Sequence, residues 1–75
     1  MQNRPTVKVK NLFRCGKASY QSSAGEVELE VFRMKGMENY YIRINGRNTG
    51  MCRGDAESAW ILCSEYLSIN IIKGE

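Results

Sequence analysis

The stretch that decides the fold runs from residue 40 to residue 67: YYIRI (40–44), NG (45–46), RNTGMCRGD (47–55) and AESAWILCSEYL (56–67). Asn45-Gly46 separates two segments in which apolar and polar side chains alternate. A type I′ turn needs positive φ at both central residues, and Asn-Gly is the dipeptide that best accepts this. We therefore expect a two-residue hairpin, which sets Ile42 opposite Thr49 and Tyr40 opposite Met51.

A second hairpin is predicted upstream, between the alternating segment 26–34 and the strand 40–45. Loop 35–38 would join them, so that Met34 faces Asn39. One register then pairs Leu29 with Ile44, Glu30 with Arg43, Val31 with Ile42 and Phe32 with Tyr41. Apolar residues meet on one side, while an aromatic pair and an ion pair meet on the other. A slip by one residue would turn every side chain over, so this register is strongly specified.

The segment 56–67 has the pattern of a capped amphipathic helix. Asp55 is a good N-cap, and Glu57 lies in the first turn, where the helix dipole favours an anion. The apolar stripe comprises Ala56, Ala59, Trp60, Cys63, Tyr66 and Leu67. Trp60 is predicted to be the core anchor of this stripe. Ile61 and Leu62 widen the apolar surface, which predicts cover on two sides of the helix.

The flanking segments predict two more strands. Residues 6–10 alternate, with Val7 and Val9 inward. Phe13 keeps the same parity but Asn11 breaks it, so we expect the strand to bulge or end there. Residues 16–25 are rich in Ser and Gly and are interpreted as a linker. Residues 68–72 alternate with β-branched residues and predict a short strand beside the edge of the sheet. The expected fold class is α+β: a three-stranded antiparallel meander, N-terminal and C-terminal strands, and one α-helix packed on one face.

Length and composition bound the class of protein. Seventy-five residues make one small domain, spanning 1–75, and no apolar run is long enough to cross a membrane. Residues 1–5 contain no apolar signal segment, so we expect a cytoplasmic protein.

The chain has three widely spaced cysteines and no histidine, which argues against a disulfide framework, a metal site or a cofactor. Cys63 is predicted to be a small buried hydrophobe, and Cys15 lies beside Arg14 and Lys17. Without histidine, general acid–base catalysis would need a perturbed carboxylate, lysine or cysteine, so we expect a non-enzyme.

Positive charge is concentrated at the N-terminus. Residues 1–25 hold five basic residues and no acid, whereas residues 26–75 hold six basic residues against eight acids. A basic segment of this kind suits a contact with nucleic acid or with an acidic protein. Lysines along an edge strand also prevent aggregation between strands, and the composition alone leaves both interpretations open.

The first functional hypothesis is a protein-binding module. In size and outline the chain resembles the accessory proteins with which phages and other mobile elements block host machinery, such as RNA polymerase inhibitors and anti-CRISPR proteins. That resemblance implies that the chain occupies a surface of a host protein or protein complex and inhibits or modulates it. The expected contact residues are Phe32, Lys35, Tyr41, Arg43, Arg47 and Arg53, with Met37 extending the patch. Alternatively, Phe32 and Tyr41 only shield each other, and an edge strand could support a homodimer.

The second functional hypothesis is nucleic-acid binding. The run 41–47 followed by a helix with Ala56 and Ala59 inward resembles the sheet-plus-helix domains of AP2 factors and integrase arm-binding modules. Those families read DNA through the sheet face opposite the helix, where Glu28 and Glu30 would here oppose phosphates. The basic residues that would have to carry the contact are Lys8, Lys10, Arg14, Lys17 and Arg47.

Overall fold

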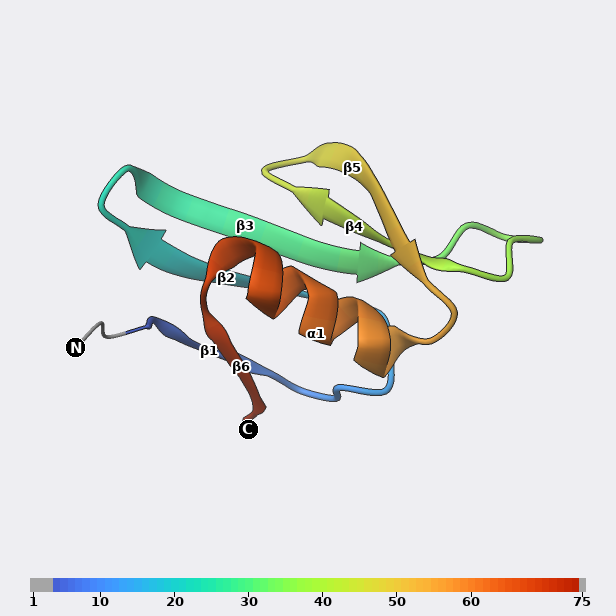
Figure 1. Cartoon of the computed structure of the whole chain (residues 1–75), viewed down its shortest axis with the longest axis horizontal. Helices are drawn as coiled ribbons and strands as arrows, with labels where there is room; N and C mark the ends of the chain where they lie inside the picture. Colours follow the sequence, from blue (N-terminus) through green and yellow to red (C-terminus); the bar gives the residue numbers. More distant parts are fainter. Residues whose placement is uncertain (1–3, 75) are drawn as a thin grey trace.

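The computed structural model describes residues 4–74, so the first three residues and Glu75 lie outside the description. The elements follow in the order β1 (Thr6–Val9), β2 (Gly16–Ser22), β3 (Gly25–Phe32), β4 (Tyr40–Ile44), β5 (Arg47–Arg53), α1 (Ala56–Leu67) and β6 (Asn70–Lys73). Strands β2 to β5 form an antiparallel sheet in sequence order, and β1 pairs with β6 in a separate parallel ladder. Helix α1 crosses one face of the large sheet (Figure 1). The predicted α+β meander with one packed helix is confirmed.

The β3–β4 hairpin has the predicted register. Val31 pairs with Ile42 and Leu29 with Ile44, and these apolar side chains face the helix. On the other side, Phe32 pairs with Tyr41 and Glu30 with Arg43. Ile42 is fully buried, whereas both of its neighbours in the chain remain half-buried. Tyr41 and Arg43 therefore point away from the helix, as the alternation predicts.

Strand β5 departs from the predicted pairing beyond its first residues. The Asn45-Gly46 turn sets Arg43 opposite Asn48, but the register then shifts, and Tyr40 pairs with Arg53 instead of Met51. The shift occurs at Gly50, whose φ of 81° lies in the left-handed region that bulges use. The Thr49 hydroxyl donates a hydrogen bond of 2.8 Å to the Ile42 carbonyl and holds the bulge against β4.

The predicted linker at 16–25 is wrong, because most of it is strand β2. This strand pairs with β3 along its whole length, from Gly16 opposite Val31 to Ser22 opposite Gly25. Its residues have low strand propensity, apart from Tyr20, so the alternation is weak in the sequence. Tyr20 and Ala18 pack against the core from this strand, and the pairing with β3 compensates for the poor propensity.

The first and last strands form a pair of their own. Val7 lies opposite Ile71 in the parallel β1–β6 ladder, so the last strand pairs with β1 and not with an edge of the large sheet. Val7 and Val9 are buried as predicted. Strand β1 ends at Val9, close to Asn11, where the parity breaks. The chain then bends, and Leu12 packs against the core while Phe13 is 69% exposed.

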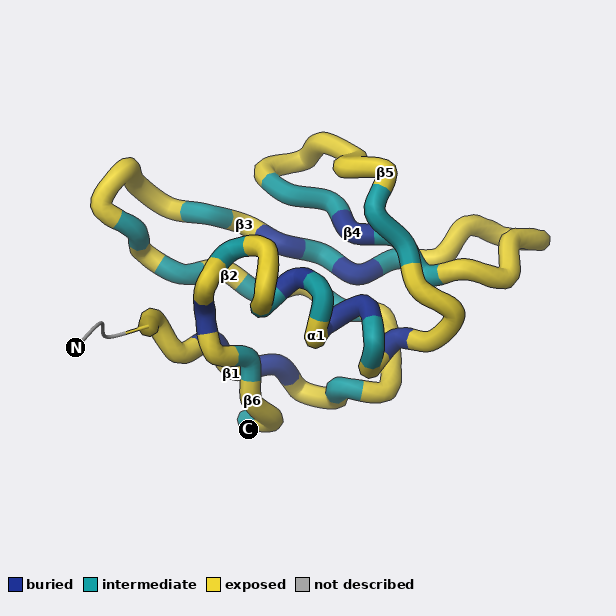
Figure 2. The backbone as a smooth tube through the Cα atoms, viewed as in Figure 1, coloured by how far each residue is buried: buried dark blue, intermediate teal, exposed yellow. Residues whose placement is uncertain are grey.

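Helix α1 buries a narrower stripe than predicted. Ala56, Ala59, Trp60 and Cys63 are buried, and Trp60 is the largest of the fully buried side chains. Buried and exposed positions alternate around the helix (Figure 2). Tyr66 is 63% exposed and Ile61 is 53% exposed. At about 100° per residue, Ile61 points roughly 150° away from the centre of the buried stripe and is not covered. Leu62 does pack against the core, and the helix contacts β6 as well as β3, β4 and β5.

The N-terminal end of the helix is capped by Asp55 as predicted, and the C-terminal end is capped by Ser68, which the sequence pattern assigns to the last strand. Asp55 accepts a hydrogen bond of 2.7 Å from the Ser58 amide, and this bond holds the pKa of the Asp55 carboxyl below its usual range. Ser68 adopts left-handed φ and ψ at the C-terminal end and turns the chain toward β6. Within residues 4–74, no helix combines the length and apolar character needed to cross a membrane.

Candidate functional site

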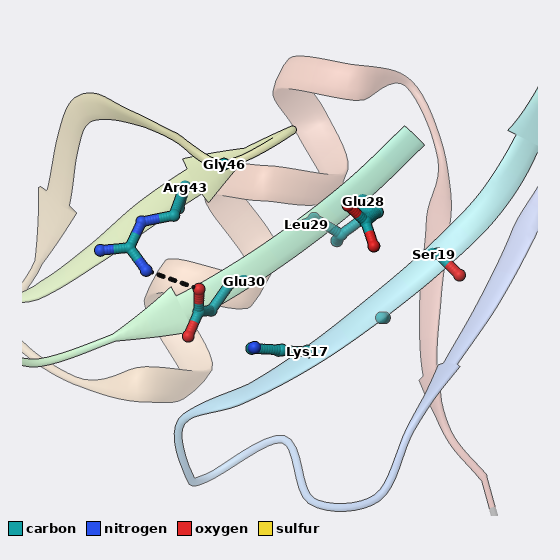
Figure 3. Close-up of a pocket in the computed structure, with 8 residues that line it drawn as sticks. Lys17, Ser19, Glu28, Leu29, Glu30, Arg43 and Gly46 are labelled. Atoms are coloured by element: carbon teal, nitrogen blue, oxygen red, sulfur yellow. Dashed lines mark hydrogen bonds and ion pairs between the residues drawn. The ribbon is translucent and has the colours of Figure 1, made fainter. Parts of the chain in front are cut away.

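The outer face of the large sheet, opposite α1, carries three of the six contact residues of the first functional hypothesis: Phe32, Tyr41 and Arg43. Strands β2, β3 and β4 each present alternate side chains on this face (Figure 3). We define the aromatic patch as Phe32, Tyr41 and Arg43. These three side chains are half-buried against one another on an otherwise solvated surface.

The aromatic patch is held by three contacts. The rings of Phe32 and Tyr41 lie with their centroids 6.0 Å apart and tilted by 32°. The guanidinium carbon of Arg43 stands 4.1 Å from the Phe32 ring centroid. The Arg43 Nη1 also donates to Glu30 Oε1 at 2.9 Å. Each such contact contributes only about 0.5–1 kcal/mol at a partly exposed site, but together they fix the guanidinium in one place.

A shallow depression of about 560 Å³ adjoins the patch on the same face. Glu28 and Glu30 line it from β3, Lys17 from β2 and Arg43 from β4 (Figure 3). Two carboxylates and two cations thus meet in one hollow. Such a mixed surface matches the polar part of a protein interface better than it matches a phosphate backbone, which each carboxylate repels.

The remaining predicted partner-binding residues do not join the aromatic patch. Lys35 lies in the loop after β3 and is exposed. Arg47 and Arg53 stand at the two ends of β5. They pair with Ile44 and Tyr40, which pack on the helix side of the sheet. Glu30 and Lys17 take their place on the outer face, and the cross-strand pairing of β2 with β3 is what brings Lys17 there.

The predicted nucleic-acid residues divide differently. Lys8, Lys10, Arg14 and Lys17 gather around a second groove, of about 510 Å³, beside β1. Arg47 lies elsewhere, at the β4–β5 turn. Arg4, which the charge asymmetry includes, lies before β1 and is exposed.

The titratable groups with clearly shifted pKa values have structural explanations. Burial raises the pKa of the Cys63 thiol to about 11. Burial also raises the pKa of Tyr20, and the charge of Cys63 adds to this. Cys63 is buried as predicted, Cys52 is half-buried and Cys15 is exposed, and all three are free thiols. Among residues 4–74, no group of three or more potential metal ligands lies together.

Comparison of the chain with known protein families, characterised proteins and solved structures finds no significant match.

Proposed function

We propose that this chain is a non-catalytic protein-binding module and that its contact surface is the outer face of the sheet, centred on the aromatic patch. The observation that carries the proposal is the fixed cluster of Phe32, Tyr41 and Arg43. Aromatic and arginine side chains dominate the binding energy of protein interfaces. On this face they stand together, outside the core, and Arg43 also lines the polar hollow.

The arrangement favours binding because the patch is ordered before a partner arrives. Immobilising a flexible side chain at an interface costs about 0.5–1.5 kcal/mol. Arg43 has already lost much of this freedom, since Glu30 and the Phe32 ring both hold its guanidinium. Binding a partner would therefore cost less conformational entropy at Arg43 than at a flexible side chain, so more of the contact energy would remain as affinity.

The partner class that we propose is a host protein or protein complex, which the chain inhibits or modulates by covering a surface. This is the mode of action of the phage and mobile-element accessory proteins that the chain resembles in outline. The mixed charges of Glu28, Glu30 and Lys17 would form the polar rim, and the aromatic patch the centre. DNA is a poorer partner for this face, because the two carboxylates would oppose phosphates.

The test is a pull-down from a lysate of the source organism, treated with nuclease and analysed by mass spectrometry. We expect a stoichiometric protein partner that survives the nuclease. Tyr41→Ala should weaken its capture by more than about fivefold if Tyr41 is an anchor. Tyr66→Ala is the matched control, because Tyr66 is an exposed ring on the helix, away from this face.

Two results would contradict the proposal. One is equal loss of the partner with Tyr41→Ala and Tyr66→Ala, and the other is a signal that nuclease abolishes. Circular dichroism of both variants, with thermal melting, would verify that neither change unfolds the chain.

A further inference from the structure

The groove beside β1 is lined by four cationic side chains from the N-terminal third of the chain: Lys8, Lys10, Arg14 and Lys17. Within the described residues 4–74, no carboxylate is among those that line it. Its floor includes the buried side chains of Val9 and Trp60. Lys17 also lies opposite Glu30 in the β2–β3 ladder, so the other three cations carry most of the uncompensated charge.

The loop that carries Arg14 is fixed to the core. The indole Nε1 of Trp60 donates a hydrogen bond of 3.0 Å to the Arg14 carbonyl, which ties this loop to the helix. The Phe13 amide donates to Asn11 Oδ1 at 2.8 Å and closes a turn within the loop. Gly74 also lines the groove; its amide donates to the Val9 carbonyl, and it lies against the stem of Lys8, where any side chain would collide.

An exposed aromatic ring stands on the same turn. Phe13 is the most exposed of the large hydrophobic residues in the described chain, at 69%. Its neighbours Asn11 and Arg14 both line the groove, while Leu12 packs inward and anchors the turn. Leaving apolar surface in water forgoes about 25 cal/mol of burial free energy for each square ångström exposed. Phe13 is not among the residues that pack on the core, so its exposed ring has no structural role there.

We propose that this groove binds the phosphate backbone of a single-stranded nucleic acid, with Phe13 as the platform on which an unpaired base stacks. Proteins that bind single strands combine a positively charged groove with exposed aromatic rings. Cations alone would suit any polyanion. The ring selects a single strand, because the bases of a duplex are already stacked and turn only their edges outward.

This site is separate from the protein-binding surface of the proposed function. The two share only Lys17, so either proposal can fail while the other stands. The variants that test the groove therefore leave Lys17 unchanged.

The experiment is fluorescence anisotropy with a labelled oligothymidylate of about 12 nucleotides, which is within the range of small single-strand sites. A duplex of the same length serves as competitor. Phe13→Ala should weaken binding at least about fivefold, and Tyr66→Ala, which removes a ring of similar exposure, should leave it unchanged. Arg14→Gln should weaken binding, whereas Arg53→Gln, an equal change of charge at the end of β5, should have little effect.

The salt dependence gives a second readout. With three phosphates neutralised, the slope of log affinity against log salt should be about −2. Arg14→Gln should reduce this slope by about 0.7, and Phe13→Ala should leave it unchanged, because the ring carries no charge.

Three results would overturn the proposal. The first is no binding at low salt with the protein at about 100 µM, which is the weak limit of non-specific affinity. The second is displacement by the duplex as efficiently as by unlabelled single strand. The third is an affinity that Phe13→Ala leaves unchanged, which would mean a polyanion site only.

Discussion

Replacing Gly50 with alanine should destabilise the fold, whereas the same replacement at Gly54 should not. A Cβ at either position would meet nothing within 4 Å, so crowding does not distinguish them. The backbone does: Gly50 has a φ of 81° in the β5 bulge, while Gly54, before the helix, lies outside the left-handed region. The pair therefore isolates the cost of the bulge conformation.

The expected magnitudes follow from this difference. Placing an L-residue in the left-handed region costs about 1–2 kcal/mol. An alanine at a compatible glycine stabilises by as much as about 0.4–1 kcal/mol, because the unfolded chain loses freedom. For a chain of this size the total stability is roughly 4–11 kcal/mol, so Gly50→Ala removes a measurable share of it.

Urea denaturation followed by the fluorescence of Trp60 is a suitable assay, since this buried residue is the one tryptophan of the chain. With a slope of about 1 kcal/mol per molar urea, the midpoint should fall by about 1–2 M for Gly50→Ala and hold or rise for Gly54→Ala. Equal midpoints for the two variants would refute the strained bulge, and with it the pairing of Tyr41 with Cys52 that the bulge produces.

Two further predictions concern the core. Burial raises the pKa of the Cys63 thiol from 9.0 to about 11 in the folded chain. The folded state therefore holds this proton more tightly than the unfolded state does. The resulting stabilisation is fully present below pH 9 and is lost as the pH rises toward 11. The difference in unfolding free energy between the native chain and Cys63→Ala should thus be constant below pH 9 and shrink above it, and parallel curves would contradict this cause. Trp60→Phe removes the indole N–H that donates to the Arg14 carbonyl and should lower the free energy of unfolding by about 1–3 kcal/mol. Cleavage by trypsin after Arg14 should accelerate more than cleavage after Arg47, and equal acceleration at both would show that the loop is not specifically released.

The sequence predicts the β3–β4 hairpin well because several signals agree there. An aromatic pair, an ion pair and two apolar pairs all select one register, and all four pairings are present. Strand β2 was not predicted, because Gly, Lys, Ala, Ser and Gln carry little strand propensity. Pairing with β3 stabilises this strand, and the local sequence pattern does not reveal that pairing.

The local sequence pattern also does not predict which distant strands pair with each other. Alternation predicts β1 and β6 as strands, but a parallel pair has no connecting turn to mark its partner. Phe13 kept the parity of Val7 and Val9 in the sequence, and the bend after Val9 reversed its side. That bend places Phe13 on the surface, in the turn whose residues Asn11 and Arg14 line the groove.

At the candidate sites, the predicted parity correctly places the three residues of the aromatic patch on one face. It does not predict which other charged residues lie next to them. Phe32, Tyr41 and Arg43 share a face as expected, but the bulge and the strand ends leave Arg47 and Arg53 outside the patch. Lys17 was predicted from its charge alone, and only β2 places it between both depressions.

The parallel β1–β6 ladder has a mechanical consequence. Thr6 begins one strand and Lys73 ends the other, at opposite ends of the same ladder. A pull on these two residues in opposite directions loads the evenly spaced hydrogen bonds in shear, all together, whereas an antiparallel hairpin pulled from its open end would unzip one bond at a time. Stretching the molecule through these residues should therefore meet its main resistance at this ladder.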